Sequence, residues 1–536
     1  MRKRYVHICI SLLLATGLWA NDTVFVSGAV QHDGLLDWTP VMYHSNSYLD
    51  LAVNWQTERR SFRELRAITR LEMNQWPMLG YESDFAGHGV GRLSLEAAFT
   101  WGEITVGDVY GQFGSGLILN LHEDRALGLD GALRGAKLDL RPWRGLHLTL
   151  LGGKQRRYWT CYHDQAWGWN YGRDAAMGAD LELHIDQWSA QMQQQDIHLT
   201  LAGSYVSKYE ADDTILTPIQ GTLYRYHLPR FVGAADVRAA LQVKGFDLLL
   251  EYACKANDPC RENNYSYRWG HAALLSLGYS RKGLAVLLQA KFSDNMTFRS
   301  ERQRIGIAGR LNHMPAFATQ HTYRLAALYP YATNYSDTEI AVQGELRYTW
   351  ARRTAMGGRY GTSLKGNACH IRVWNRGEAY TDAHVELDKR LSAHWWLHAM
   401  VMYQAYNQLA VEGHGSTVRS GIFVLDARTQ LNDNLSMRGE LQYLYSPHHE
   451  GQWFFALYEL SLYRHWTLSG EWLYNIGYAP DATNRHYYTA GLTFTYNAHR
   501  AMLAYTKTRE GFNCSGGICR YVPQQQGISL SYSFTW

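Results

Sequence analysis

The stretch that decides the fold is Gly527-Ile528-Ser529-Leu530-Ser531-Tyr532-Ser533-Phe534-Thr535-Trp536. Every even position from Ile528 onward is large and apolar or aromatic, and every odd position after Gly527 is Ser or Thr. Side chains along a β-strand alternate between two faces, so this stretch predicts a strand with one apolar face and one hydroxyl-lined face. A soluble sandwich could place such a strand at the edge of a sheet.

The aromatic residues of this strand, Tyr532, Phe534 and Trp536, argue against the soluble sandwich. An amphipathic strand that ends in Phe or Trp resembles the assembly signal of bacterial outer-membrane β-barrels. The resemblance implies that the chain meets the barrel-assembly machinery and then outer-membrane lipid. The remainder of the chain should then consist of similar strands.

Alternation of the same kind recurs along the chain, most regularly at residues 435–445, 466–474 and 488–496. These runs have roughly the nine to eleven residues that a tilted strand needs to cross a bilayer. Shorter alternating runs occur at residues 246–252 and 146–150. The heavy load of Tyr (37) and Trp (19) favours a membrane barrel, because amphipathic rings collect at bilayer interfaces.

The connections also alternate in length. Tight turns at residues 497–499, 464–465 and 431–434 fall on the side of Trp536, and longer loops at 509–526, 475–485 and 446–451 fall on the other. We therefore predict an all-β transmembrane antiparallel barrel of about 24 strands (range about 22 to 26), with short periplasmic turns and long outer loops. Residues 293–320 form either one long outer loop or an extra hairpin. The alternative to a membrane barrel is a soluble all-β stack.

The N-terminus predicts that the chain is exported. Arg2, Lys3 and Arg4 precede an apolar run at residues 8–18, and Ala20 offers a cleavage point, so we predict a signal peptide at residues 1–20. Residues 21–536 then form one outer-membrane barrel domain, since no linker divides them. Loss of the three cations lowers the formal net charge from +4 to +1, which gives no support for nucleic acid as a partner.

Six cysteines follow the predicted signal peptide, and an even number in an exported chain favours disulfides. Two close pairs lie in polar, turn-rich stretches: Cys254 with Cys260, and Cys514 with Cys519. A short loop of this kind can be bridged at modest strain, so we predict both disulfides. Whether Cys161 pairs with Cys369 stays open.

The most unusual stretch includes Gly111-Gln112-Phe113-Gly114-Ser115-Gly116-Leu117 and, downstream, Leu127-Gly128-Leu129-Asp130. Its glycines permit positive φ or close backbone approach. No helix and no Lys-Ser/Thr pair follow, so the stretch is not a phosphate loop. With these two segments the chain resembles an uncharacterised family of Bacteroidota outer-membrane barrels. The resemblance implies a fold and a location, and no activity.

Residues 111–132 could fold into the lumen and constrict it. Gly111, Gly114 and Gly116 would allow the chain to turn inward, and Glu123, Asp124 and Arg125 would then face passing solute. The alternative is a glycine-kinked strand that leads to an ordinary surface loop.

Two functions follow from the predicted barrel. The first is a pore or channel for small solutes. The second is a non-transporting scaffold, or a subunit of a secretion apparatus, that binds partners through its outer loops. Alternation begins at residues 23–27, which leaves no room for an N-terminal plug domain and disfavours TonB-coupled uptake.

Other candidate sites are weaker. No spacing selects a catalytic triad or a paired-acid site, so we expect no enzyme, and we predict no cofactor or metal. The sequence His448-His449-Glu450 has metal-ligand chemistry but lies in a short loop without visible partners. Residues 154–159, a basic and aromatic cluster, would suit acidic headgroups or belong to an interfacial aromatic belt.

Overall fold

The computed structural model describes residues 22–38, 41–57, 61–74, 76–159, 174–211, 214–219, 222–448, 450–477 and 485–536. The predicted signal peptide, Cys161 and His449 lie outside these residues.

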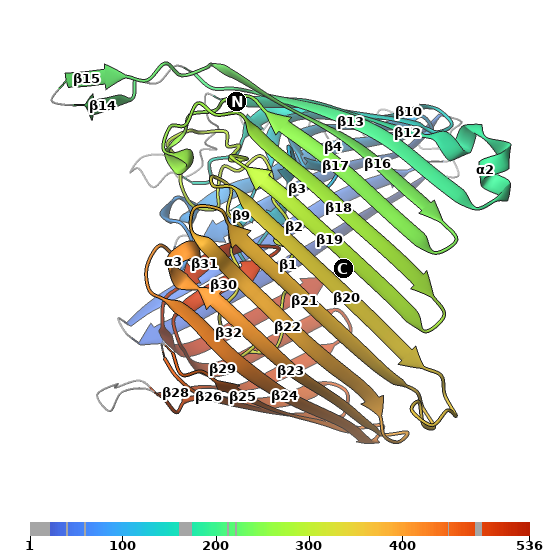
Figure 1. Cartoon of the computed structure of the whole chain (residues 1–536), viewed down its shortest axis with the longest axis vertical. Helices are drawn as coiled ribbons and strands as arrows, with labels where there is room; N and C mark the ends of the chain where they lie inside the picture. Colours follow the sequence, from blue (N-terminus) through green and yellow to red (C-terminus); the bar gives the residue numbers. More distant parts are fainter. Residues whose placement is uncertain are drawn as a thin grey trace.

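Twenty-four strands form one antiparallel sheet that closes on itself (Figure 1). The seam joins the first strand to the last, from Ala29 opposite Thr535 to Asp37 opposite Gly527. A closed sheet pairs every strand on both sides and leaves no edge. The predicted antiparallel barrel of about 24 strands is therefore confirmed. Its strands are β1 (Thr23–Trp38), β2 (Val41–Gln56), β3 (Phe62–Asn74), β4 (Gly87–Phe99), β5 (Gly102–Val109), β10 (Leu133–Trp143), β11 (Leu146–Gln155), β12 (Ala175–His184), β13 (Ile197–Tyr209), β16 (Phe231–Val243), β17 (Phe246–Lys255), β18 (Gly270–Arg281), β19 (Leu284–Asp294), β20 (Glu339–Trp350), β21 (Thr362–Val373), β22 (Gly377–Arg390), β23 (Trp395–Asn407), β24 (Thr417–Asn432), β25 (Leu435–Tyr445), β26 (Trp453–Leu462), β27 (Trp466–Asn475), β28 (His486–Tyr496), β29 (His499–Thr508) and β32 (Gln525–Thr535).

Smaller elements lie in the connections between barrel strands. They are the hairpins β6 (Gly111–Gln112) with β7 (Asn120–Leu121), β8 (Glu123–Asp124) with β9 (Leu129–Asp130), β14 (Leu216–Ile219) with β15 (Thr222–Arg225) and β30 (Gly511–Ser515) with β31 (Ile518–Val522), and the short helices η1 (Ser83–Phe85), η2 (Ile185–Trp188), α2 (Ala190–Gln194), η3 (Arg261–Asn263) and α3 (Gln408–Val411). Among the residues that the structure describes, no helix has both the length and the apolar composition to cross a membrane.

The two ends of the barrel differ in their connections. We call the end that holds Thr23 and Thr535 the terminal end, and the opposite one the loop end. Tight turns close most hairpins at the terminal end, for example between β16 and β17 and between β28 and β29. Exceptions occur at both ends: residues 185–196 and 351–361 form longer connections at the terminal end, and residues 374–376 form a tight turn at the loop end. The predicted difference between the two ends thus holds for most hairpins.

Residues 293–320 belong to one long connection at the loop end, as in the first predicted alternative, but this connection does not stay outside the barrel. β19 ends at Asp294, β20 begins at Glu339, and the described chain between them adds no strand to the barrel. An isolated bridge between Arg299 and Arg310 is the remnant of a hairpin. Instead, Phe298, Leu311 and Met314 are fully buried against the inner face of the wall, so the connection folds into the barrel.

The wall has an apolar outer face and a polar inner face. On β17, Leu250 and Tyr252 are about half exposed, whereas Glu251 and Lys255 are buried. On β32, Ile528 and Leu530 face outward, and the Ser531 hydroxyl donates a hydrogen bond to Asp33 inside. Strand side chains point alternately to the two faces. The same strands therefore place charged groups on the inner face and apolar groups on the outer face, as in membrane barrels.

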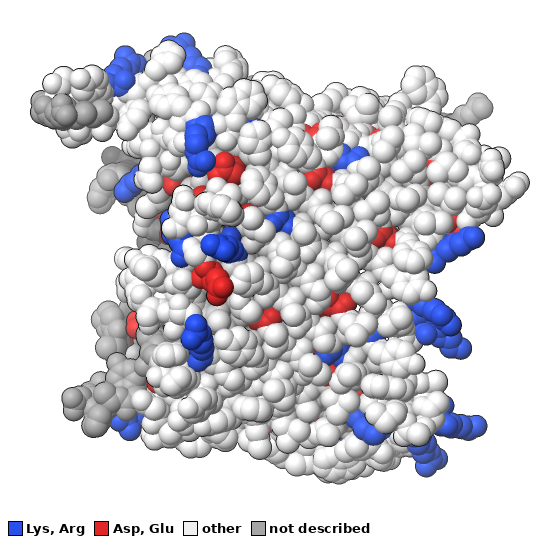
Figure 2. All heavy atoms as spheres, in the orientation of Figure 1, with Lys and Arg blue, Asp and Glu red and all other residues white. Residues whose placement is uncertain are grey.

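Exposed aromatic side chains gather near both ends of the barrel, at Trp143 and Phe246 near the terminal end and at Phe231 and Trp374 near the loop end. Figure 2 shows one side of the wall covered mainly by uncharged residues, with Lys and Arg along the right-hand rim, at the terminal end. Two aromatic girdles around an apolar band are typical of barrels that sit in a bilayer.

Candidate functional site: a lumen filled from the loop end

The connection between β5 and β10, residues 110–132, lies inside the barrel. Leu117, Ile118 and Leu119 are completely buried, in one apolar cluster with wall residues of β5 and of β10 to β18. Gly114 and Gly116 have φ of +51° and +92°, which glycine adopts without strain. A Cβ at Gly114 would lie 2.6 Å from the Glu251 carboxylate of β17, so the backbone passes close to the far wall. Gly111 lies in β6 without a positive φ.

Two of the three charged residues predicted in this segment tie it to the wall. Glu123 accepts two hydrogen bonds from the Arg70 guanidinium of β3, at 2.6 and 2.9 Å. Arg125 donates to Asp50 of β2 at 2.7 Å and stacks over the Tyr48 ring. These are charge-assisted contacts, stronger than neutral hydrogen bonds.

The third predicted residue, Asp124, has a local role. Its carboxylate accepts a hydrogen bond from the backbone N–H of Leu127 at 3.1 Å and so holds the turn of the β8–β9 hairpin. The predicted trio therefore divides into two residues that fix the segment to the wall and one that shapes the segment itself.

The basic and aromatic cluster at residues 154–159 belongs to the same network. Arg156 is buried and donates to Glu72 at 2.7 Å and to Asp130 at 2.6 Å. Arg157 pairs with Asp174 at 2.7 Å. The predicted contact of this cluster with headgroups is thus wrong for these two cations, since their charges are met by carboxylates of the barrel. Removing one partner of such a buried pair costs about 3–5 kcal/mol.

The connection between β19 and β20, residues 295–338, fills the remainder of the lumen near the loop end. Its backbone accepts from wall lysines: Lys208 donates to the Arg299 carbonyl at 2.7 Å, and Lys291 donates to the Pro315 carbonyl at 2.5 Å. Farther along, Leu325, Tyr329 and Tyr331 pack against the inner faces of β20 to β27. The two inward segments also bind one another, because the Asn312 amide donates to the Leu117 carbonyl at 3.0 Å.

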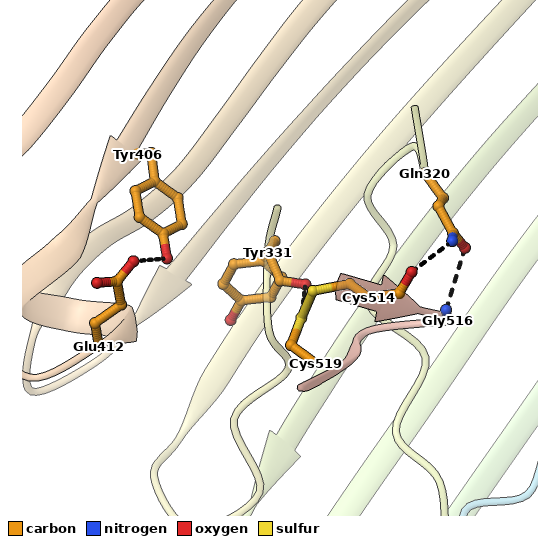
Figure 3. Close-up of a disulfide and its surroundings, with 7 residues drawn as sticks. All are labelled: Gln320, Tyr331, Tyr406, Glu412, Cys514, Gly516 and Cys519. Carbon is orange, nitrogen blue, oxygen red and sulfur yellow. Dashed lines mark hydrogen bonds between the residues drawn. A yellow bond between two sulfur atoms is a disulfide. The ribbon is translucent and has the colours of Figure 1, made fainter. Parts of the chain in front are cut away.

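The hairpin β30–β31 lies against this second segment and carries the disulfide Cys514–Cys519 (Figure 3). The Gln320 amide donates to the Cys514 carbonyl at 2.7 Å, and its oxygen accepts from the Gly516 N–H at 3.2 Å. The predicted Cys514–Cys519 bridge is confirmed, and it shapes the hairpin that clamps the inward segment.

The second predicted disulfide is wrong. Cys254 and Cys260 are both free thiols. β17 continues to Lys255 with Lys255 facing the lumen, so strand alternation turns Cys254 toward the outside. Cys260 is buried beside η3, in a connection that folds inward. Cys369 is also free and buried on the inner face of β21.

Replacing Cys514 and Cys519 together by Ser is expected to loosen the hairpin while leaving the barrel folded. A bridge that closes so short a loop contributes on the order of 2 kcal/mol. Hydrogen exchange of the Gly516 and Thr333 amides measures the effect, since Gly516 donates to Gln320 and Thr333 donates to the Gly517 carbonyl. Both amides should exchange faster than in the wild type, and unchanged protection would contradict the clamp.

A cavity of about 620 Å³ lies between the hairpin and the second inward segment. Its lining includes Gln320, His321, Arg324, Arg509 and Glu510, so it presents both charges and hydrogen-bonding groups. Burial and, after it, the neighbouring His122 lower the pKa of His313, another lining residue, to about 4. His313 is therefore neutral at neutral pH.

The inner face of the wall is less buried in the terminal half: on β25, Gln442 and Leu444 are buried, whereas Ser436 and Arg438 are partly exposed. A cavity of about 450 Å³ lies there between β22 and β26, with Arg428, Arg438 and Glu459 in its lining. Asp388 and His398 line a smaller adjoining space of about 130 Å³. The described interior is thus packed toward the loop end and polar with open space toward the terminal end.

Two groups of described residues have the composition and spacing of metal ligands: His147 with Glu182 and His184, and His321 with Asp382 and His384. Neither group was predicted from the sequence. The signal in the second group is Asp382-Ala383-His384, which places two ligands on one face of a strand, but only if the phase of that strand is known. Of the weak candidate at residues 448–450, Glu450 pairs with Arg509 at 2.8 Å.

Comparison with known proteins gives a family and a set of distant structures. A family described as a family of unknown function (DUF6029) matches residues 36–536. No curated protein matches the chain. Similar solved structures are the translocation pore of the P pilus usher PapC (10% identity, 96% of this chain and 99% of that chain, TM-score 0.36), the copper transporter OprC (11%, 97% and 82%, TM-score 0.41) and the siderophore receptor PirA from Acinetobacter baumannii (11%, 97% and 81%, TM-score 0.46). At these TM-scores the assignment of the fold rests on the strand pairing itself.

Proposed function

The chain belongs to the DUF6029 family of unknown function, and from that premise we propose that it is an outer-membrane channel for small polar solutes, closed in this conformation by its own inward segments. Backbone groups cannot stay unpaired in hydrocarbon, so a β-protein crosses a bilayer as a closed barrel. The closed seam, the apolar outer face and the two aromatic girdles support this location. Outer-membrane lipid and the barrel-assembly machinery are the partners that it implies. An origin in Bacteroidota stays a prediction.

The observation that carries the proposal is the one-sided filling of the lumen. The terminal half offers a charged cavity of about 450 Å³, which suits polar solutes and water rather than a permanent core. Toward the loop end, the path is closed by chain segments that are held to the wall partly through ion pairs, such as Glu123 with Arg70. Groups of this kind regain water when they separate, so their contacts can be exchanged for solvent.

The filling comes from connections between strands. Residues 110–132 and 295–338 occupy the place that a separate plug domain takes in barrels of the TonB type. A gate built from loops needs no energy-coupling partner, because a shift of one loop is enough to open a path. This supports passive, solute-selective passage over coupled uptake. We propose no enzymatic activity.

A second function, a scaffold that binds partner proteins, is favoured by the hairpin β14–β15. It projects away from the barrel (Figure 1, top left), and Leu216, Leu223 and Tyr224 on it are more than half exposed. An exposed two-stranded hairpin with apolar side chains suits addition of a strand from another chain.

Planar-bilayer recording of the purified, refolded protein, paired with co-purification from its membrane, tests the proposal. We expect a low mean conductance with infrequent but stable openings that discriminate between solutes, because the inward segments close the path for most of the time. Absence of openings, together with stoichiometric co-purifying proteins that are lost when residues 214–225 are deleted, would favour the scaffold instead.

A further inference from the structure

We propose that His321, Asp382 and His384 form a site for a divalent transition metal, with Zn²⁺ as the reference ion, and that the bound metal fastens the second inward segment to the wall. His321 belongs to residues 295–338, whereas Asp382 and His384 lie on the inner face of β22. The site therefore joins a loop that fills the lumen to a strand of the barrel. It does not depend on the proposed channel function.

The three side chains converge on one carboxylate. His321 Nε2 lies 2.5 Å from Asp382 Oδ2, and His384 Nδ1 lies 2.9 Å from Asp382 Oδ1. One ligand atom from each of the three residues lies within 4.8 Å of the others. In a tetrahedral zinc site with bonds of about 2.1 Å, donors lie about 3.4 Å apart. The group thus needs only a small outward adjustment of the rings to admit an ion.

The ligand chemistry fits a metal of intermediate softness. Two imidazoles with one carboxylate suit Zn²⁺, Co²⁺, Ni²⁺ or Cu²⁺, whereas Mg²⁺ and Ca²⁺ prefer oxygen donors alone. Three protein ligands leave a further coordination position open. The charge of the ion would also be partly met by Asp382, whose side chain is fully buried.

Outer partners are present as well. His384 Nε2, the nitrogen that faces away from Asp382, lies 3.2 Å from Glu386 Oε1, at a geometry short of a hydrogen bond. A carboxylate behind a ligating imidazole is the usual way in which proteins fix the ring and its tautomer. Across the strand pair, Asn367 lies opposite His384 and is buried, and neither of its amide atoms has a hydrogen-bond partner among the described residues. A buried polar group without a partner calls for an explanation, and a bound ion with its water is one that fits here.

An ion has a way in. His321 lines the cavity of about 620 Å³ beneath the hairpin β30–β31, and Tyr380, two residues before Asp382 on the same face of β22, lines it too. The adjacent Gln320 is held by the hairpin on both of its amide atoms. The proposed site and the disulfide clamp therefore fix neighbouring positions of the same segment.

The experiment uses untagged, refolded full-length barrel that carries His147→Gln, which removes one ligand of the other group, His147 with Glu182 and His184. Co²⁺ is titrated alone, its visible absorption reports the coordination geometry, and Zn²⁺ is then added in competition. We expect one Co²⁺ per barrel with bands of low-coordinate cobalt, displacement by Zn²⁺, and a rise in the thermal unfolding temperature with Zn²⁺. His321→Gln and His384→Gln should each lose these bands and the rise.

His398→Gln is the matched control, because His398 also faces the lumen beside a carboxylate, Asp388, but has no second imidazole there. Made in the His147→Gln protein, it should bind Co²⁺ as the His147→Gln protein alone (the background protein) does. If His384→Gln fails to fold, His321→Gln decides, since His321 lies outside the barrel strands. Absence of Co²⁺ binding by the background protein, or equal binding by folded His321→Gln, would overturn the site and leave a metal-free His–Asp–His hydrogen-bond chain.

Discussion

Deletion of residues 112–126 is expected to raise the mean conductance of the barrel several-fold and to replace infrequent openings by long ones. The deleted stretch contains the fully buried residues 117–119, which occupy the lumen, and both charged ties to β2 and β3. A 24-stranded ring is wide enough to hold an aqueous path once its contents are removed. Single-channel recording in planar bilayers measures the change.

The wall should tolerate this deletion. Arg70 keeps its 2.6 Å ion pair with Asp50 after Glu123 and Arg125 are lost, so no charge is stranded on that side. Asp130, the partner of Arg156, lies outside the deleted residues. Resistance of the folded form to unfolding in detergent at room temperature checks that the ring is closed.

Deletion of residues 214–225 is the matched control for the conductance measurement. It removes a comparable length of chain from the hairpin β14–β15, which projects away from the barrel (Figure 1) and whose β15 residues are all exposed. Its conductance should equal that of the wild type. A folded 112–126 deletion with unchanged conductance would show that this segment does not limit passage. If that deletion does not fold, the pair of substitutions Glu123→Gln and Arg125→Gln should still raise the frequency of opening.

Deletion of Trp536 is expected to reduce the folded barrel in the outer membrane to a small fraction of the wild-type amount. Trp536 extends the seam beyond the ladder: its N–H donates to the Gly28 carbonyl at 3.0 Å, and its carbonyl accepts from the Gly28 N–H at 3.1 Å. Its ring covers Gly28, where a Cβ would lie 2.3 Å from a ring carbon, and stacks on Phe534. The two hydrogen bonds contribute about 1 kcal/mol each, and the rings add to them.

Two variants separate the seam from a general need for aromatic residues. Gly28→Val removes no aromatic ring but forces the Trp536 ring away, so it should lower the folded amount as well. Tyr496→Ala removes an exposed aromatic side chain at the same end, away from the seam, and should fold normally. Heat-modifiable mobility on gels gives the folded fraction. Wild-type amounts of folded protein without Trp536 would count against the role of the seam.

The strands could be predicted because alternation is a local property. Residues 435–445 are β25 to the residue, and the expected run at 466–474 is β27 without its last residue. The terminal strand also has the predicted phase, with Leu530 outward and Ser531 inward. Each of these predictions needs only the period of two, which a single strand contains in full.

The contents of the lumen could not be predicted in the same way. His321 and Asp382 meet across 61 positions of sequence, and Ser115 meets Glu251 across 136. The error at Cys254 has the same origin, because the composition of its neighbourhood indicates a loop whereas β17 runs on to Lys255. The apolar residues Phe298, Leu311, Met314 and Leu325 are a weak signal by themselves, because exposed loops also carry single apolar side chains.

The hydrogen bond from Asn312 to the Leu117 carbonyl has a consequence for how the protein forms. Its partners are 195 positions apart, and Asn312 also donates to the Met296 carbonyl at 2.7 Å, so one side chain joins the two inward segments. The first segment therefore lacks part of its support until residue 312 has been delivered. Contacts this distant make for slow, late acquisition of structure. The lumen therefore completes its packing late in folding, after residue 312 has joined the first inward segment.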